Sequence, residues 1–158
     1  MEFSFLTKSH EETVHVGRNL GQVVEIGCVV CLIGDLGAGK TCFMKGVANG
    51  LNGVPETEVT SPTFTILQAY EGSVPLYHFD AYRLEGVEDL DDIGFEDYVY
   101  GQGVSFIEWA DNISKAIPEE RMLIEIEIKG DENRLFKCSA EGEKHEAILD
   151  KFITMLEG

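Results

Sequence analysis

Gly34-Asp35-Leu36-Gly37-Ala38-Gly39-Lys40-Thr41 decides the fold, because this stretch fits the pattern GxxxxGK[ST] of a phosphate-binding loop. The apolar run Cys28-Val29-Val30-Cys31-Leu32-Ile33 precedes it and predicts a strand, and a helix is expected from about Lys40 to Leu51. A phosphate-binding loop requires strand, loop and helix in this order. The chain is therefore predicted to bind a nucleoside triphosphate.

The residue types of this loop have separate tasks. Its glycines let the backbone curl so that successive N–H groups face one anion, and the dipole of the following helix adds positive potential there. The Lys40 ammonium would reach the β- and γ-phosphate oxygens, and the Thr41 hydroxyl would coordinate a Mg²⁺ ion that bridges them. The alternative is a glycine-rich turn that only caps a helix. The predicted nucleotide-binding residues of the loop are Asp35, Leu36, Gly37, Ala38, Gly39, Lys40 and Thr41.

Two later apolar runs each end in an acid, which nucleotide hydrolysis also needs. Leu76-Tyr77-His78-Phe79 leads to Asp80, and Val104-Ser105-Phe106-Ile107 leads to Glu108. Glu108 has the strand-end placement of an acid that holds Mg²⁺, directly or through water. Asp80 is interpreted as the catalytic or switch acid. The alternative for both is a solvated carboxylate at a strand end or a helix N-cap.

The hydroxyl-rich segment Val59–Leu67 lies between the loop helix and the next strand, where switch segments reach a γ-phosphate or its Mg²⁺. Thr63 and Thr65 are its candidate sensing residues, and Pro62 would stiffen the approach. An ordinary loop, whose threonines cap local backbone, remains the alternative.

Two other side chains near these acids need an interpretation. Trp109 is the only tryptophan and follows Glu108 directly, so it packs in the core or, alternatively, on the site or on a partner. His78 is interpreted as a packed strand residue and not as a base.

The remaining patterns complete an α/β fold. Ser9 and Glu12 form a capping box before a helix from about His10 to Val24. The runs 121–128 and 134–140 predict a hairpin, and a helix from about 142 to 156 ends the chain. We therefore expect a single P-loop NTPase-like domain over residues 1–158, with three layers, a central mixed sheet covered on both faces, and a C-terminal β-hairpin plus helix.

Charge and hydropathy narrow the functional classes. Lys and Arg total 12 against 29 Asp and Glu, and the net charge of -17 disfavours independent binding of nucleic acid. The N-terminus lacks a basic region followed by a long apolar stretch, and no run approaches the ~20 apolar residues of a membrane span. The protein is expected to be soluble and cytoplasmic.

The pair Cys28 and Cys31 has the CxxC spacing of zinc and redox sites. Residues three apart on a strand point to opposite faces, so these sulfurs cannot easily converge. We interpret both as core thiols.

Acidic residues gather between Glu85 and Val99 without one Lys or Arg. Apolar residues alternate with them, so an acidic amphipathic helix is expected, interrupted at Gly94. Such a helix is either a solvated face or a docking face for a basic partner.

Four motifs together resemble one family. The phosphate-binding loop, Ser61-Pro62-Thr63-Phe64-Thr65, Tyr77-His78-Phe79-Asp80-Ala81-Tyr82-Arg83-Leu84 and Ile107-Glu108-Trp109 are similar to the motifs of the TsaE family. These are the bacterial P-loop ATPases required for threonylcarbamoyladenosine (t6A) modification of tRNA.

The resemblance implies a cytoplasmic protein that binds ATP with Mg²⁺ and hydrolyses it slowly alone. It would join TsaD and TsaB, which transfer threonylcarbamoyl to adenosine 37 of ANN-decoding tRNAs, so that tRNA is met only through the complex. The family's Walker lysine and threonine match Lys40 and Thr41, and its metal-associated glutamate matches Glu108.

The family's switch and catalytic positions match Thr65 and Asp80, and its tryptophan matches Trp109. Its contacts with the nucleotide base lie near the start of the first helix and near an arginine of the late hairpin. Ser9, His10 and Arg134 are the corresponding candidates.

Two other functions compete with this interpretation. A small-molecule P-loop kinase would share the size and early topology, but such enzymes usually close an arginine-bearing lid over the phosphoryl group. The arginines here are only Arg18, Arg83, Arg121 and Arg134. A switch that binds ATP without hydrolysing it would have the same sequence features.

Overall fold

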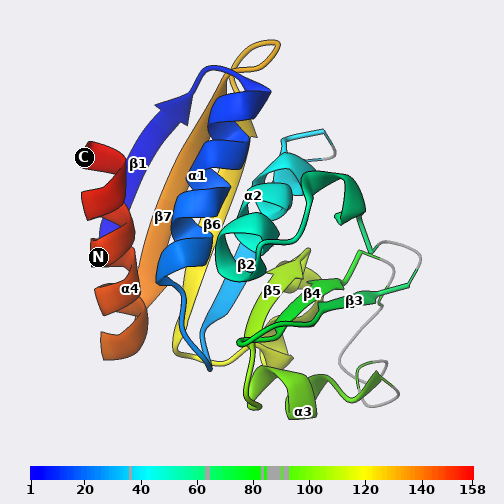
Figure 1. The fold of residues 1–158 in the computed structure, drawn as a ribbon. Helices are drawn as coiled ribbons and strands as arrows, with labels where there is room; N and C mark the ends of the chain where they lie inside the picture. Colours follow the sequence, from blue (N-terminus) through cyan, green and yellow to red (C-terminus); the bar gives the residue numbers. More distant parts are fainter. Residues whose placement is uncertain (36, 63–64, 83, 85–89, 91–92) are drawn as a thin grey trace.

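One mixed sheet forms the centre of the computed structural model, which describes residues 1–35, 37–62, 65–82, 84, 90 and 93–158 (Figure 1). Its seven strands follow the order β1-β7-β6-β2-β5-β4-β3. The strands are β1 (Glu2–Thr7), β2 (Val29–Ile33), β3 (Leu67–Tyr70), β4 (Leu76–Asp80), β5 (Val104–Glu108), β6 (Arg121–Ile128) and β7 (Arg134–Glu141).

The helices lie between these strands in the sequence. The α-helices are α1 (His10–Val23), α2 (Lys40–Asn52), α3 (Phe95–Val99) and α4 (Glu143–Glu157), and the 3₁₀ segments are η1 (Glu56–Glu58) and η3 (Ala110–Ala116). Helix α1 begins as predicted, because the Ser9 side chain accepts a hydrogen bond from the Glu12 N–H. The α/β class, the mixed sheet and the C-terminal hairpin with its helix are confirmed.

The centre of the sheet is parallel, and this arrangement creates the site. Strand β2 pairs in parallel with β5 and β6, and β4 pairs in parallel with β5. The carboxyl ends of β2, β5 and β4 therefore meet at one edge, outside which open α/β sheets bind their ligands. In this register Glu108 is the partner of both Leu32 and Asp80.

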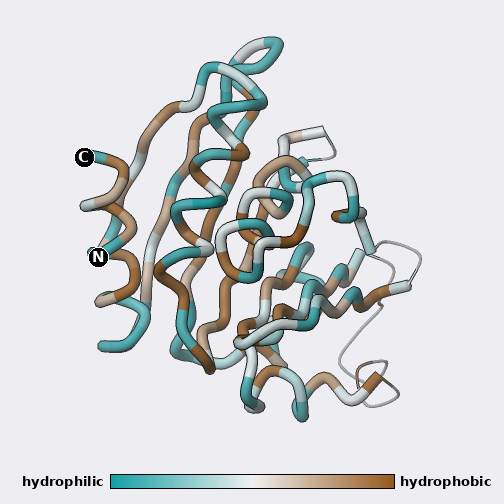
Figure 2. Tube along the Cα trace, in the orientation of Figure 1, coloured by the Kyte–Doolittle hydropathy of each residue, from teal (hydrophilic) through white to brown (hydrophobic). Residues whose placement is uncertain are grey.

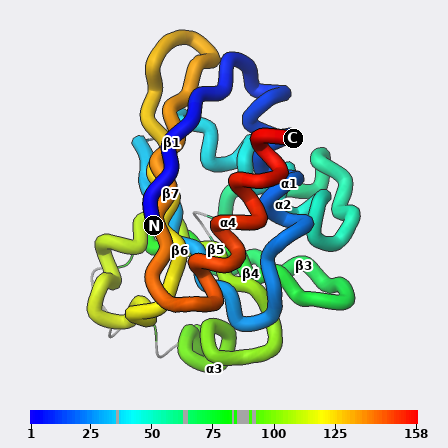
Figure 3. Tube along the Cα trace, turned by 90° about the vertical axis from the view of Figure 1, so that its left-hand side faces the viewer, coloured from blue at the N-terminus to red at the C-terminus, as the bar shows by residue number. Residues whose placement is uncertain are grey.

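Two hydrophobic clusters lie on opposite faces of the sheet. Figure 3 looks along the sheet from its β1 edge and shows α4, α1 and α2 together on one side. Residues of these helices and of the strands beneath them form the larger cluster, and α3 with η3 covers part of the other face. In Figure 2 hydrophobic residues recur along the strands and at intervals along the helices. The three layers are thus of unequal size.

The second face is less covered than the sequence led us to expect. Leu6 on β1 is 59% exposed, and Lys137 on β7 is also exposed. Within the described part of the chain, helical cover on this face is limited to the strands near α3 and η3.

The cysteine interpretation is confirmed. Cys28 belongs to the larger cluster and Cys31 to the smaller, so the sheet separates the two sulfurs. Burial raises the pKa of Cys28 to about 12 and that of Cys31 to about 11, which keeps both as unreactive thiols.

Glycines bring α1 and α2 into close contact. A Cβ on Gly46 of α2 would stand 1.9 Å from the Val14 carbonyl oxygen, and one on Gly17 of α1 would stand 2.1 Å from that of Phe43. These distances exclude any side chain, so the glycines fix the position of α2 and hence of the loop that precedes it.

Strand β1 was missed in the sequence. Its residues alternate between polar and apolar only from Glu2 to Phe5, and so short a run at a terminus predicts little by itself. Pairing with β7 stabilises it, and Phe5 stacks on Phe136 with the ring centroids 4.8 Å apart.

The acidic segment is described only in part. Helix α3 begins after Gly94, which has a φ of 70°. Residues 85–89, 91 and 92 of the segment lie outside the described residues, as do Leu36, Thr63 and Arg83. Each helix in the described ranges is too short or too polar to cross a bilayer.

Candidate nucleotide site

The loop between β2 and α2 has the backbone of an anion-binding turn. Gly37 and Gly39 have φ values of 82° and 102°, which residues with side chains rarely adopt. The Ala38 N–H donates to the Asp35 carbonyl, and Gly39 leads directly into α2 without a side-chain cap. The N-terminal N–H groups of this helix thus stay available for an anion.

Lys40 lies between this loop and the acids. Only 6% of the residue is exposed, and its Nζ donates a 2.7 Å hydrogen bond to the Gly34 carbonyl. The same nitrogen is 3.8 Å from Glu108 Oε1 and 4.4 Å from the centroid of the Trp109 ring. The ammonium is therefore held by a carbonyl, a carboxylate and an aromatic face, without a direct ion-pair hydrogen bond.

Asp80 and Glu108 each end a strand, as predicted, and the structure shows that these two strands are adjacent and parallel. Both acids are buried. Asp80 Oδ1 accepts a 2.9 Å hydrogen bond from the Tyr82 N–H. Both acids line a hollow of about 240 Å³ together with the phosphate-binding loop. The lining residues are His10, Gly37, Gly39, Lys40, Thr41, Cys42, Ser61, Asp80, Glu108 and Trp109.

The donor set of this hollow fits Mg²⁺. Thr41 contributes an exposed hydroxyl, and Glu108 and Asp80 contribute carboxylates. Mg²⁺ prefers oxygen ligands and is usually held by one or two side chains together with substrate phosphates and water. The residues present are of the required type and number.

Other predicted residues take different places. Ser9 caps α1, whereas His10 lines the hollow, and its backbone N–H donates to Glu132 Oε1 at 3.1 Å. Thr65 is exposed, and its hydroxyl donates a 3.4 Å hydrogen bond to the Pro62 carbonyl. Ser61, not Thr65, represents the switch segment in the hollow, and the catalytic role of Thr65 stays a prediction.

Arg134 is the predicted site residue whose observed contacts differ most from those expected from the sequence. It is 5% exposed, and its Nε and Nη2 donate to the carbonyls of Ala38 and Gly37 at 2.9 and 3.2 Å. Its Nη1 donates to carbonyls at the tip of the β6–β7 hairpin, including that of Gly130. Arg134 thus braces the phosphate-binding loop against the hairpin, and its contact with a nucleotide base stays a prediction.

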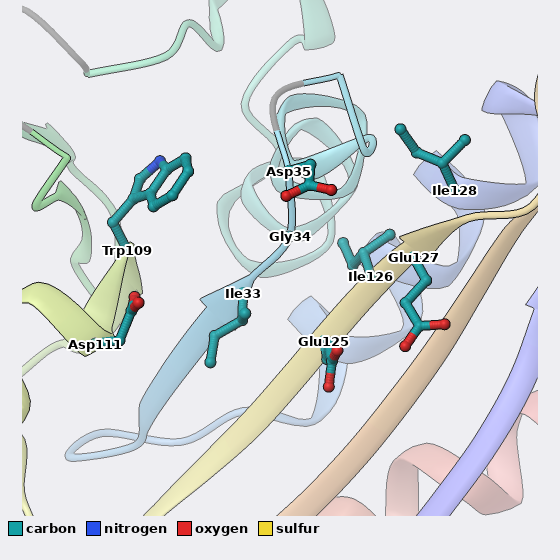
Figure 4. Close-up of a pocket in the computed structure, with 9 residues that line it drawn as sticks. All are labelled: Ile33, Gly34, Asp35, Trp109, Asp111, Glu125, Ile126, Glu127 and Ile128. Atoms are coloured by element: carbon teal, nitrogen blue, oxygen red, sulfur yellow. The ribbon is translucent and has the colours of Figure 1, made fainter.

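A second hollow of about 370 Å³ adjoins the site (Figure 4). Trp109 and Asp35 line it, with Asp111, Glu125 and Glu127. Four carboxylates would repel a triphosphate, so the smaller hollow beside Lys40 is the better nucleotide site. Trp109 lines both hollows.

Sequence reasoning missed the places of Ser61 and His78 in the site and the bracing role of Arg134. Ser61 carried the same hydroxyl signal as Thr63 and Thr65 but was not selected. His78 was assigned to packing, and its hydrogen bond to Glu108 depends on the order of β4 and β5. Arg134 is distant from the loop in sequence, and its carbonyl contacts give no pattern in the residues.

The fold and this loop define an α/β protein of the P-loop class. The family model described as "Threonylcarbamoyl adenosine biosynthesis protein TsaE" matches residues 7–136. The chain therefore belongs to the TsaE family.

Individual relatives agree with this assignment. The chain is similar to the tRNA threonylcarbamoyladenosine biosynthesis protein TsaE of Treponema pallidum, with 46% identity over 82% of this chain and 94% of the relative. The protein of the same name from Bacillus subtilis is 40% identical over 95% of this chain and 93% of the relative. The crystal structure of Bacillus subtilis YdiB superposes with a TM-score of 0.82 at 34% identity, covering 100% of this chain and 97% of that one.

Proposed function

We propose that this chain is the Mg²⁺-dependent, ATP-hydrolysing subunit required for t6A formation at position 37 of ANN-decoding tRNAs. It acts in the cytoplasm with the TsaD and TsaB proteins. Membership of the TsaE family and the names of its relatives support the part of this proposal that concerns t6A biosynthesis. The observation that carries the proposal is the buried Lys40 ammonium, which lies at the start of α2 with Glu108 Oε1 3.8 Å away.

In this proposal the loop side of the site, from Gly34 to Thr41, binds the triphosphate. The N–H groups from Gly37 to Thr41 donate to the β- and γ-phosphate oxygens, and the dipole of the 13-residue helix α2 adds to their attraction. The Lys40 Nζ exchanges its contact with the Gly34 carbonyl for phosphate oxygens. The Trp109 ring covers the same ammonium and limits its contact with water.

The acid side of the site, with Asp80 and Glu108 at the ends of β4 and β5, supplies the groups that hydrolysis needs. Thr41 and Glu108 hold Mg²⁺, which when bound offsets phosphate charge and orients the γ-phosphate. The Asp80 carboxylate lies at the end of β4 and accepts a proton from, or orients, the attacking water. Its hydrogen bond from the Tyr82 N–H fixes one of its oxygens.

The negative charge of the chain supports contact with tRNA only through the partner proteins. A net charge of -17 repels the phosphate backbone, whereas it favours a basic protein surface. Hydrolysis by this subunit would then act on the TsaD and TsaB complex and not on tRNA directly.

The arginines of the described chain do not support the kinase alternative. Arg134 is committed to loop carbonyls, Arg18 pairs with Glu56 at 3.0 Å, and Arg121 donates to the Glu119 carbonyl. None of these three lines the hollow beside Lys40.

The experiment that tests the proposal is Mg²⁺-dependent ATP hydrolysis by the purified chain, alone and with TsaD and TsaB, with Lys40→Ala as the blank. We expect slow turnover alone and faster, Lys40-dependent turnover in the complex. Phosphate transfer to a small-molecule acceptor would instead identify a kinase. ATP binding without turnover in any combination would identify a non-hydrolytic switch.

A further inference from the structure

A buried histidine contacts the acid that we assign to Mg²⁺. His78 is the third residue of β4 and is 1% exposed, and its Nε2 is 2.6 Å from Glu108 Oε2. Glu108 is itself 4% exposed. The partner of His78 in β5 is Phe106, two residues before Glu108, so the histidine lies beside the carboxylate on the same face of the sheet. A hydrogen bond this short between two buried groups is a strong one.

The surroundings of the ring indicate which nitrogen carries the proton. His78 Nδ1 is buried and has no hydrogen-bond partner in the described part of the chain. A protonated Nδ1 would be an unpaired buried N–H, which is costly, whereas an unprotonated Nδ1 leaves only a lone pair. The geometry therefore favours the tautomer whose Nε2–H donates to the Glu108 carboxylate.

Because of this hydrogen bond, the two carboxylate oxygens of Glu108 have different partners. Oε2 is occupied by His78, while Oε1 points toward Lys40 at 3.8 Å. Without the donor, the carboxylate would be free to rotate and to form a closer ion pair with the Lys40 ammonium. Such a pair would turn the carboxylate away from the metal.

We propose that His78 is a positioning residue, which holds Glu108 so that a single carboxylate oxygen faces Mg²⁺ and the phosphates. This inference rests on the proposed function, because it concerns the same site. Partners that orient a metal-binding carboxylate typically change metal affinity or activity by about 10–100-fold when they are replaced.

The test uses two matched substitutions in the full-length chain. His78→Phe keeps a flat ring but removes the donor. His78→Gln places an amide N–H at the same number of bonds from the backbone as Nε2–H. Calorimetric titration of ATP at a series of Mg²⁺ concentrations measures the metal dependence of binding without relying on turnover, and ATP hydrolysis is measured in parallel.

We expect His78→Phe to raise the Mg²⁺ concentration needed for half-maximal enhancement of ATP binding by about 10–100-fold. ATP binding without Mg²⁺ should change less than about threefold, because Lys40 and the loop are intact. His78→Gln should restore most of the Mg²⁺ dependence. In a Glu108→Gln background, His78→Phe should have no further effect on it, because the two residues act as one unit.

An equal loss in both His78 variants, or a full additional loss in the Glu108→Gln background, would overturn the assignment in favour of a packing role. Should His78→Phe fail to fold by circular dichroism, His78→Asn replaces it, since its shorter amide also loses the contact. A wild-type chain that binds no ATP would refute the proposed function. If the wild-type chain binds ATP with Mg²⁺ and His78→Phe shows the same Mg²⁺ dependence, only the inference about His78 is refuted.

Discussion

The two sides of the nucleotide site are built differently. The loop side, from Gly34 to Thr41, is one continuous segment that uses backbone N–H groups and a helix end. The acid side combines His78, Asp80 and Glu108 from two strands that meet only because β4 pairs with β5. The loop side is thus defined by local conformation and the acid side by sheet topology. This difference predicts binding defects from one side and turnover or metal defects from the other.

Lys40→Ala should have the largest effect, because it removes the cation of the loop side. We expect ATP affinity to fall by roughly 100-fold or more, from the loss of charged hydrogen bonds of about 1.5–3 kcal/mol to phosphate oxygens. Fluorescence of the single tryptophan, Trp109, which lies against Lys40, provides a titration signal. Lys45→Ala on the same helix is the matched control, and equal affinities for the two variants would contradict the assignment.

Asp80→Asn tests the acid side alone. The amide keeps the size of the side chain and can still accept from the Tyr82 N–H, so the fold should be preserved. We expect hydrolysis to fall by about 100-fold or more, as for loss of a general base, while ATP affinity stays within about threefold. Asp111→Asn, in the neighbouring acidic hollow, is the control and should hydrolyse ATP normally. Normal turnover of Asp80→Asn would remove this carboxylate from the chemistry.

The same contrast explains what the sequence could predict. The loop side was predicted residue by residue, because spacing, glycines and the preceding apolar run are all local signals. The strand-end positions of Asp80 and Glu108 were also predicted, but their proximity depends on β4 and β5 being neighbours, which no local pattern specifies. His78 could not be assigned for the same reason. Arg134 was assigned only by resemblance, and its bracing role follows from tertiary contacts with Gly37 and Ala38.

Arg134→Met should weaken the loop side without affecting chemistry. The methionine keeps an unbranched apolar stem but leaves the loop and hairpin carbonyls without donors. Loss of these charged hydrogen bonds should lower stability by about 2 kcal/mol and Tm by about 4–8 °C. ATP affinity should fall by about tenfold, the equivalent of 1.4 kcal/mol, with turnover at saturating ATP nearly unchanged. Arg121→Met is the control, since the Arg121 guanidinium donates to the nearby Glu119 carbonyl and not to the phosphate-binding loop within the described residues. A normal Tm for Arg134→Met would show that the loop needs no brace.

The smallest expected effect is a dependence of stability on pH. It arises at the contact between α4 and β2, the strand that precedes the phosphate-binding loop. His145 on α4 is 3% exposed, and its Nε2 accepts a 3.0 Å hydrogen bond from the N–H of Val29, the first residue of β2. Burial lowers the pKa of His145 below its ordinary value of 6.5, and nearby Lys144 lowers it further, while Glu120 partly opposes them.

The sign of the effect follows from this lowered pKa. The unfolded chain binds a proton at His145 more readily than the folded chain does, so protonation favours unfolding. The contribution of His145 to stability is complete above about pH 6.5 and is lost as the pH falls through the lowered folded-state pKa. A protonated ring would also place an N–H against the Val29 N–H. Tm should therefore decrease by a few degrees between pH 7.5 and pH 5, since each kcal/mol corresponds to about 2–4 °C in a chain of this size.

His145→Gln isolates this contribution, because its amide oxygen can accept from Val29 without titrating near neutral pH. The other three histidines and the carboxylates remain in both proteins, so the difference between their Tm curves reports His145 alone. We expect the two curves to run parallel above pH 7 and the wild type to fall more steeply below it. Parallel curves down to pH 5 would mean that the link between α4 and β2 tolerates a charged ring. In that case the scaffold that carries the phosphate-binding loop would tolerate a buried charge at its contact with α4.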